Sequence, residues 1–266
     1  MTKISSIMIY GICIYLLIIL IMFIFQRSLL YQPSKEKLDI SYYNSSGLRK
    51  VNFTTSDGIV LKSLFKKPTK SENTIVVFHG NAGHIGHRVK KFKPFMDEGY
   101  GLLLLEYRGY GENKGKPSES GLYIDGKAAL DFLTNHNIPA HKIILYGESL
   151  GCGLAVKFST ENSFKATILE APYTSIADVA IRQYWYLPAK WLVLDRFDII
   201  SKIKNINSPL LVLHGLKDKI ISIEFGKKVF NSAPKLKKAL YIPDAGHNNL
   251  YEFDTYTKVI SFLRQK

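Results

Sequence analysis

Short apolar runs alternate with longer amphipathic stretches through most of the chain that follows Pro68. Six runs have the length of a strand, at residues 74–78, 102–107, 143–146, 167–169, 210–213 and 239–242. Five other stretches have helical character, at residues 89–98, 121–135, 151–160, 223–233 and 256–264. Strands that are apolar throughout are buried on both faces. The alternation therefore predicts an α/β domain in which a mostly parallel sheet has helices on both faces.

Two segments depart from this alternation. Residues 51–54 and 59–65 flank Ser56-Asp57-Gly58, and Asp-Gly between two apolar runs predicts an antiparallel hairpin before the parallel strands. Residues 172–207 form a long insertion that carries six aromatic side chains, Tyr173, Tyr184, Trp185, Tyr186, Trp191 and Phe197. We expect this insertion to be a helical lid over a site. The alternative is a peripheral helix pair that packs its aromatic side chains inward.

The longest apolar run lies at the N-terminus. Residues 4–25 carry no charge, and a helix of that length extends about 33 Å, enough to cross a hydrocarbon core of about 30 Å. A cleaved signal peptide has a shorter apolar region that ends in small residues, whereas this run ends in Phe-Ile-Phe-Gln-Arg at residues 23–27. We therefore expect a single transmembrane anchor at residues 1–28, a connector at 29–46, and one domain over residues 29–266.

The net charge indicates which partners the chain could bind, and the cysteine content indicates whether disulfides hold it together. The net charge is +14, from 36 Lys+Arg against 22 Asp+Glu. No nucleic-acid-binding module accompanies this charge, so an anionic membrane surface fits better, and a lysine-rich solvated surface is the plainer alternative. The basic residues that flank the apolar run favour a cytoplasmic domain, with Lys3 before it and Arg27, Lys35 and Lys37 after it. Cys13 and Cys152 are the only cysteines, which excludes a disulfide framework.

A G-x-S-x-G motif is the clearest candidate for chemistry, at Gly147-Glu148-Ser149-Leu150-Gly151. It follows a predicted strand and precedes a predicted helix, an order that exposes a serine on a sharp turn. A five-residue motif also occurs by chance, so the interpretation depends on an acid, a base and an oxyanion hole elsewhere in the chain. If it holds, Ser149 is the nucleophile, and the order along the chain is serine, acid, histidine.

Two histidines follow Ser149 and are candidates for the base. His214 ends an apolar strand, and we expect it to pack there. His247 lies in the loop between the last predicted strand and the last helix. Loops at the carboxyl ends of parallel strands are where binding and catalytic side chains gather. His247 is therefore the expected base.

Four aspartates are candidates for the acid that orients the imidazole. Asp218 directly follows the penultimate predicted strand and is the expected acid. Asp195 and Asp198 fall in the insertion, where no strand end fixes them. Asp244 is close in sequence to the histidine and is accounted for as a turn residue.

Acyl transfer also needs two N–H donors for the oxyanion. The backbone N–H of Leu150 is one candidate, because it follows the nucleophile at a helix N-terminus. The backbone N–H of Asn81 is the other, in the glycine-containing loop after the first parallel strand. His79, His84 and His87 lie in or after that loop, but no carboxylate or cysteine ligand lies near them in sequence. We therefore expect no metal, and we expect His79 to brace the loop.

Four separated pieces of this sequence resemble the α/β-hydrolase superfamily: residues 79–83 (His-Gly-Asn-Ala-Gly), residues 147–151, Asp218 and His247. Residues 107–111 (Tyr-Arg-Gly-Tyr-Gly), followed by residues 115–119, resemble the membrane-anchored bud-emergence (Bem-like) branch, in which a hydrophobic helix precedes the hydrolase domain. Glu106 departs from that pattern, where aspartate is expected at a position that is not catalytic. The resemblance implies an α/β-hydrolase fold and serine esterase chemistry without a cofactor, in a branch that includes protein-depalmitoylating members.

The sequence thus predicts a membrane-anchored serine hydrolase that acts on ester or thioester bonds of a small acyl ester, an acyl-lipid or an acyl-protein. Ser149, Asp218 and His247 would form the triad, with Asn81 and Leu150 as oxyanion donors and with no metal or nucleic acid involved. The alternative is a catalytically silent binding protein on the same fold, tethered to the membrane. Inactive relatives usually lose a triad member, whereas here all three positions are filled.

Overall fold

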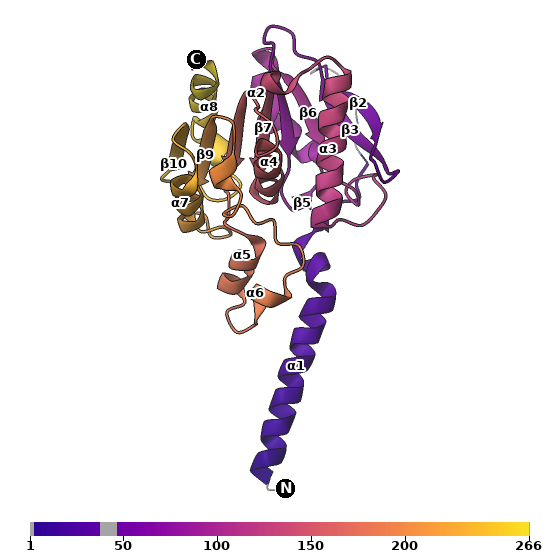
Figure 1. Cartoon of the computed structure of the whole chain (residues 1–266), viewed down its shortest axis with the longest axis vertical. Helices are drawn as coiled ribbons and strands as arrows, with labels where there is room; N and C mark the ends of the chain where they lie inside the picture. The colour runs from indigo at the N-terminus through magenta and orange to yellow at the C-terminus, as the bar shows by residue number, and fades with distance from the viewer. Residues whose placement is uncertain (1–2, 38–46, 266) are drawn as a thin grey trace.

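The computed structural model describes residues 3–37 and 47–265, and an eight-stranded sheet forms its centre (Figure 1). In sheet order the strands are β10 (Lys237–Ile242), β9 (Leu210–Gly215), β8 (Ala166–Glu170), β7 (Ile143–Glu148), β4 (Thr74–Phe78), β6 (Gly101–Leu105), β3 (Val60–Lys66) and β2 (Arg49–Thr54). Neighbouring strands from β10 to β6 run parallel, whereas β3 is antiparallel to both β6 and β2. The parallel sheet and the hairpin before it are confirmed.

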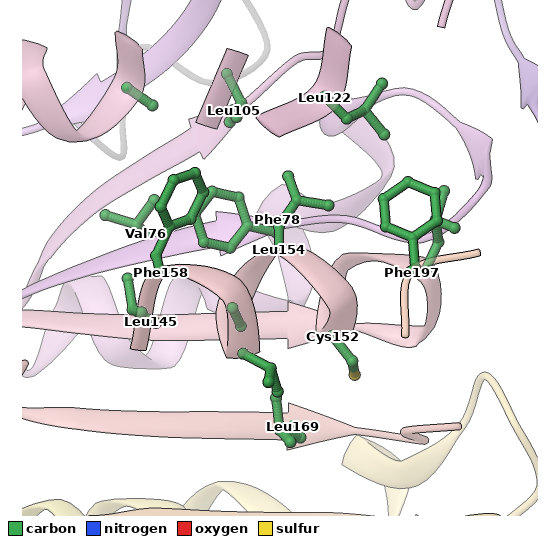
Figure 2. Packing of buried hydrophobic residues seen from close by; sticks show 14 of the residues in the cluster. Val76, Phe78, Leu105, Leu122, Leu145, Cys152, Leu154, Phe158, Leu169 and Phe197 are labelled. Atoms are coloured by element: carbon green, nitrogen blue, oxygen red, sulfur yellow. The ribbon is translucent and has the colours of Figure 1, made fainter. Parts of the chain in front are cut away.

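Helices cover both faces of this sheet (Figure 1). One face packs against α3 (Glu119–Asn135), α4 (Cys152–Ser159) and α7 (Ile223–Ser232), and the other against α2 (Val89–Asp97) and α8 (Thr255–Arg264). Alternate residues of each central strand enter the two cores, as expected for side chains that alternate along a strand. Figure 2 shows part of the first core, where Phe158 of α4 packs on Phe78 of β4 with ring centroids 5.6 Å apart.

Shorter elements complete the described chain. The insertion contains α5 (Ile176–Gln183), α6 (Ala189–Leu192) and the 3-10 helix η5 (Ile203–Asn205). The other short 3-10 helices are η2 (Ile85–Arg88), η3 (Ala140–Lys142), η4 (Ser149–Gly151) and η6 (Leu250–Glu252). β1 (Gln32–Pro33) pairs in parallel with β5 (Ala82–Gly83). β1 lies in the segment predicted as a connector, and it was not predicted because a strand of two residues has no readable pattern. Residues 38–46 of that connector lie outside the described residues.

The helix α1 (Lys3–Leu30) extends away from the domain (Figure 1). Its apolar window, Ser6–Leu30, has a mean hydropathy of 3.0 and is not buried inside the protein. By length and composition it is the one helix among the described residues that suits a membrane span, and a signal sequence would share these properties. The end of α1 is fixed to the insertion, since Arg27 pairs with Asp195 at 2.8 Å.

Candidate active site

The turn after β7 places Ser149 at the carboxyl edge of the sheet. Ser149 has a φ of +49°, in the left-handed region that residues other than glycine rarely adopt. A Cβ atom on Gly151 would lie 1.9 Å from the carbonyl oxygen of Phe78, and one on Gly147 would lie 2.6 Å from Cα of Cys152. Both glycines of the motif are therefore required by close backbone approach. The turn has the strained geometry of a nucleophile elbow.

Ser149, His247 and Asp218 form one hydrogen-bonded chain. His247 Nε2 lies 3.1 Å from Ser149 Oγ, and His247 Nδ1 lies 2.7 Å from Asp218 Oδ2. Since an ionised carboxylate only accepts, Nδ1 carries the proton and Nε2 accepts from the serine hydroxyl. The structure brings these three residues together from three separate connections, after β7, β9 and β10. This tautomer is the one that a general base requires.

Asp218 is held in place by four groups. Its Oδ1 accepts from the backbone N–H groups of Ile220 and Ile221 at 2.9 and 2.8 Å. Its Oδ2 faces His247 and also lies 3.3 Å from His214 Nε2. Burial raises the pKa of Asp218, but the hydrogen bonds from His214 and His247 outweigh that effect and hold the pKa below its ordinary value. The acid therefore stays ionised at neutral pH.

His214 contributes to the site in a way that its sequence position did not reveal. It is buried at the end of β9, as expected, and its Nε2 lies 2.9 Å from the carbonyl oxygen of Ile221. A Cβ on Gly226 would lie 2.3 Å from His214 Nδ1, so α7 packs directly on the ring. His214 thus fixes the loop that carries Asp218. The four-residue spacing between them is the only signal in the sequence.

The other candidate acids are engaged elsewhere. Asp195 is buried and pairs with Arg27 of α1. Asp198 accepts from a backbone N–H within its own turn at 3.2 Å. Asp244 forms an exposed pair with Lys217 at 2.6 Å. In the described part of the chain, none of these three carboxylates is hydrogen-bonded to the imidazole of the site.

The loop after β4 lies directly against Ser149. A Cβ on Gly80 would lie 3.6 Å from Ser149 Cβ, so the backbone of this loop passes beside the serine. The carbonyl of Asn81 accepts from the Tyr110 hydroxyl at 2.7 Å, and its side-chain amide donates to the last turn of α1 at 2.9 Å. Asn81 and Leu150 both line the cavity beside Ser149. This is where the predicted oxyanion donors would have to lie.

His79 and Glu106 brace the same loop from within the protein. Both side chains are buried, with His79 Nε2 3.4 Å from Glu106 Oε1. The ring of His79 lies 4.1 Å from that of Tyr107, and its Nδ1 lies 2.8 Å from the carbonyl oxygen of Gly80. Glu106 also accepts from the backbone N–H of Ile85 at 3.1 Å. Glu106, the residue that departs from the expected pattern, therefore has a structural role.

A buried charge network holds Glu148, the residue before Ser149. Glu148 accepts from Arg88 at 2.9 Å and from Lys91 at 3.1 Å, and Lys91 also pairs with Glu170. Burial raises the pKa of Glu148, but the charges of Lys91 and Arg88 outweigh it and lower the pKa below its ordinary value. Arg88 also donates to the carbonyl of His84 at 3.2 Å. The network thus links the turn at Ser149 to the segment that follows the loop after β4. Its members are too distant in sequence to form a motif.

A carboxylate that is distant in sequence lies close to His84 and His87 in space. Glu36 Oε2 lies 3.4 Å from His84 Nε2 and 3.9 Å from His87 Nε2, because the pairing of β1 with β5 brings the two segments together. His84 Nδ1 accepts from the N–H of Gly86 at 3.2 Å, so the proton of the neutral ring is on Nε2. In this tautomer Nε2 of His84, the ring nitrogen nearest Glu36, has no lone pair to offer a metal ion.

An apolar cavity of about 240 Å³ leads from Ser149 toward α1 and the insertion. From α1 it is lined by Met22, Phe23, Gln26, Arg27, Leu29 and Leu30. From the insertion it is lined by Tyr173, Ile176, Val179, Ala180, Gln183, Tyr184, Leu187, Ala189, Leu192, Val193 and Asp195, with Ile220 and Ile221 from the loop after β9. The insertion therefore forms one wall of the site, and the N-terminal helix forms the other.

Comparisons with known proteins agree with this architecture. A family model described as serine aminopeptidase, S33, matches residues 69–195. An uncharacterised protein of Mycobacterium tuberculosis is 33% identical over 234 residues, which cover 86% of this chain and 83% of that protein. Protein bem46 of Schizosaccharomyces pombe is 31% identical over 258 residues, which cover 89% of this chain and 85% of that protein. A solved esterase of Pyrococcus furiosus has a TM-score of 0.70 at 17% identity, covering 88% of this chain and 97% of that one, and shares the fold.

Proposed function

The chain belongs to the α/β-hydrolase superfamily, and we propose that it is a membrane-anchored serine hydrolase that cleaves carboxylic ester or thioester bonds. The observation that carries this proposal is the chain of hydrogen bonds from Ser149 Oγ to His247, at 3.1 Å, and from His247 to Asp218, at 2.7 Å. A serine hydroxyl is a poor nucleophile unless a base lies within hydrogen-bond reach. In this proposal His247 is that base, and the buried carboxylate of Asp218 orients it.

The reaction follows from the positions of these groups. His247 Nε2 takes the proton of Ser149 as Oγ bonds to the carbonyl carbon of the substrate. Asp218 stabilises the imidazolium, and the backbone N–H groups of Asn81 and Leu150 would hold the oxyanion. The C–O or C–S bond then breaks, and the leaving alcohol or thiol takes the proton from His247. Water adds to the acyl-serine with His247 again as the base, which releases the acid and restores Ser149.

The lining of the cavity indicates that the acyl group is the part of the substrate that the protein recognises. They are mostly apolar and match a hydrocarbon chain better than a polar leaving group. Residues 1–28 would anchor the domain of residues 29–266 to a membrane, with the domain on the cytoplasmic side by its flanking charges. An acyl-lipid or an acyl-protein held at that membrane would then be within reach of Ser149.

Hydrolysis by the purified full-length protein in detergent micelles tests this function. We expect turnover of short-chain p-nitrophenyl esters or of acyl thioesters, with a loss of at least about 10³-fold in Ser149→Ala and in His247→Ala. Ser163→Ala, at an exposed serine that bonds only to the carbonyl of Asn207, is the matched control and should keep full activity. Equal activity of wild type and Ser149→Ala would refute the proposal. Absence of turnover in all forms would favour a catalytically silent binding protein.

A further inference from the structure

The tip of the insertion, residues 184–194, is almost wholly apolar, and four of its apolar side chains are exposed, those of Trp185, Tyr186, Trp191 and Leu194. It reads Tyr-Trp-Tyr-Leu-Pro-Ala-Lys-Trp-Leu-Val-Leu, with a single charge at Lys190. Trp185 is 81% exposed, Trp191 is 79% exposed and Tyr186 is 50% exposed. The expected alternative, a helix pair that packs its aromatic side chains inward, does not hold for these three residues. Exposed apolar surface of this kind marks a site of contact with another apolar phase.

The insertion tip lies alongside α1, in the part of the helix that would be in a membrane (Figure 1). The Tyr15 hydroxyl donates to the carbonyl of Tyr186 at 2.7 Å, and Gln26 exchanges hydrogen bonds with the backbone of Leu192 and Leu194. Arg27 is the first charged residue after the apolar run. At about 1.5 Å per residue, Tyr15 lies roughly 18 Å from Arg27 along the helix axis, more than half of a hydrocarbon core.

The hydrogen bonds between α1 and the insertion tip make both elements compatible with a nonpolar environment. In hydrocarbon every backbone N–H and C=O group needs a hydrogen-bond partner within the protein. An irregular segment such as the insertion tip has backbone groups without the internal hydrogen bonds of a helix. Here Tyr15 and Gln26 of α1 donate to carbonyls of the insertion at 2.7 and 3.2 Å, and Gln26 Oε1 accepts from Leu194 N–H at 2.8 Å. Tyr15 and Gln26 thereby satisfy backbone groups of the insertion and are themselves hydrogen-bonded. Lys190 is exposed, and its long side chain would reach the headgroups.

The cavity of the site runs between these two elements. Met22 and Phe23 of α1 face Tyr184, Leu187 and Leu192 of the insertion across it. Met22 lies about 7 Å deeper along the helix axis than Arg27, so this end of the cavity is at the depth of acyl chains, while the other end reaches the nucleophile. A chain that enters from the side would reach the site without crossing water.

We propose that the insertion tip is embedded in the membrane leaflet that surrounds α1, and that the cavity takes the acyl chain of its substrate laterally from that leaflet. The occupant of the exposed aromatic surface is therefore lipid. Trp and Tyr are the side chains enriched at membrane interfaces. The lateral route rests on the proposed hydrolase activity, whereas the embedding of the tip rests only on the proposed membrane anchor.

Intrinsic fluorescence tests the embedding, because Trp185 and Trp191 are the only two tryptophans in the chain. The full-length protein would be reconstituted in phosphatidylcholine–phosphatidylglycerol vesicles, with Trp185→Phe and Trp191→Phe each leaving a single reporter. We expect quenching by doxyl-labelled lipids and protection from aqueous iodide. Quenching by iodide but not by doxyl lipid would overturn the proposal. Protection from both quenchers would also overturn it, because the tip would then pack on protein, such as a second copy of the chain.

Substrate partitioning tests the lateral route. Neither tryptophan lines the cavity, so the double variant Trp185→Ser/Trp191→Ser should keep the hydrolysis of a water-soluble short-chain ester. It should lose about tenfold in turnover of a long-chain ester embedded in the vesicles, equivalent to about 1.4 kcal/mol. Leu236→Ser removes a comparably exposed apolar side chain at the N-terminus of β10 and should affect neither substrate. Equal losses on both substrates would overturn the route. Failure of the wild type to hydrolyse either ester would refute the proposed function and leave the fluorescence result to decide the embedding.

Discussion

Replacing Asp218 by asparagine tests the role of the acid, and the hydrogen bonds around it predict how the site fails. The Asn amide oxygen is fixed by the two backbone N–H groups of Ile220 and Ile221, which lie 2.9 and 2.8 Å from Oδ1. The NH₂ group is then forced to the Oδ2 position, which faces His247 Nδ1 at 2.7 Å. A donor at that position requires Nδ1 to accept, so the proton of the neutral ring moves to Nε2. His247 Nε2 would no longer accept the proton of Ser149.

The expected loss in kcat for Asp218→Asn is therefore about 10⁴-fold, or about 5.4 kcal/mol of transition-state stabilisation. The loop should keep its conformation, because the two backbone hydrogen bonds are kept, although the stability contributed by the ionised carboxylate is lost. The assay is the hydrolysis of a short-chain p-nitrophenyl ester at neutral pH, with the thermal unfolding temperature measured in parallel. Asp244→Asn is the matched control. It removes a carboxylate from the loop that carries His247, and that carboxylate pairs with the exposed Lys217. Near-normal activity of Asp218→Asn, or an equal loss in Asp244→Asn, would refute this assignment of the acid.

Three further predictions concern stability. Gly151→Ala places a Cβ 1.9 Å from the carbonyl oxygen of Phe78, so we expect a loss of at least about 3 kcal/mol in the free energy of unfolding, measured by denaturant titration. Asp195→Ala removes the buried partner of Arg27, so we expect the free energy of local unfolding of the insertion to fall by about 2 kcal/mol. The insertion should then be cleaved faster in limited proteolysis. The pKa of Asp218 is lower in the folded protein than its unfolded-state value near 3.8, so the ionised carboxylate stabilises the fold above about pH 3.8. This stabilisation is lost as the pH falls through the folded-state pKa. The unfolding temperature of the wild type should therefore fall more steeply below about pH 4 than that of Asp218→Asn.

Two controls accompany the first two of these predictions. Gly246→Ala adds a Cβ whose nearest neighbour would be 3.7 Å away, an ordinary contact, so it should be tolerated where Gly151→Ala is not. Asp198→Ala removes a carboxylate that bonds only within its own turn, so the rate of proteolysis of the insertion should stay near that of the wild type. The opposite result in either control would contradict the corresponding structural reason.

The sequence predicted the elements whose signals are local. The central strand β4 was predicted at its observed bounds, because a fully buried parallel strand is apolar from end to end. The positions of Ser149, Asp218 and His247 could be read because each lies in the connection that follows a strand, and parallel strands bring their carboxyl ends to one edge. The hairpin of β2 and β3 was readable from its Asp-Gly turn.

Contacts between distant segments left no such signal. Glu148 and Glu170 share Lys91, and none of the three stands in a recognisable pattern with the others. Asp195 was set aside because no strand end fixes it, yet α1 fixes it through Arg27. These contacts depend on where the chain folds back, and that information is not contained in a window of neighbouring residues.

The central claim is that Ser149 is a nucleophile activated by His247. A fluorophosphonate probe reacts covalently with such a serine, and peptide mass spectrometry locates the adduct. We predict a single adduct on the peptide that contains Ser149 in the wild-type protein, none in Ser149→Ala, and a strongly reduced yield in His247→Ala. An adduct on a different serine, or equal labelling of the wild type and His247→Ala, would contradict the claim.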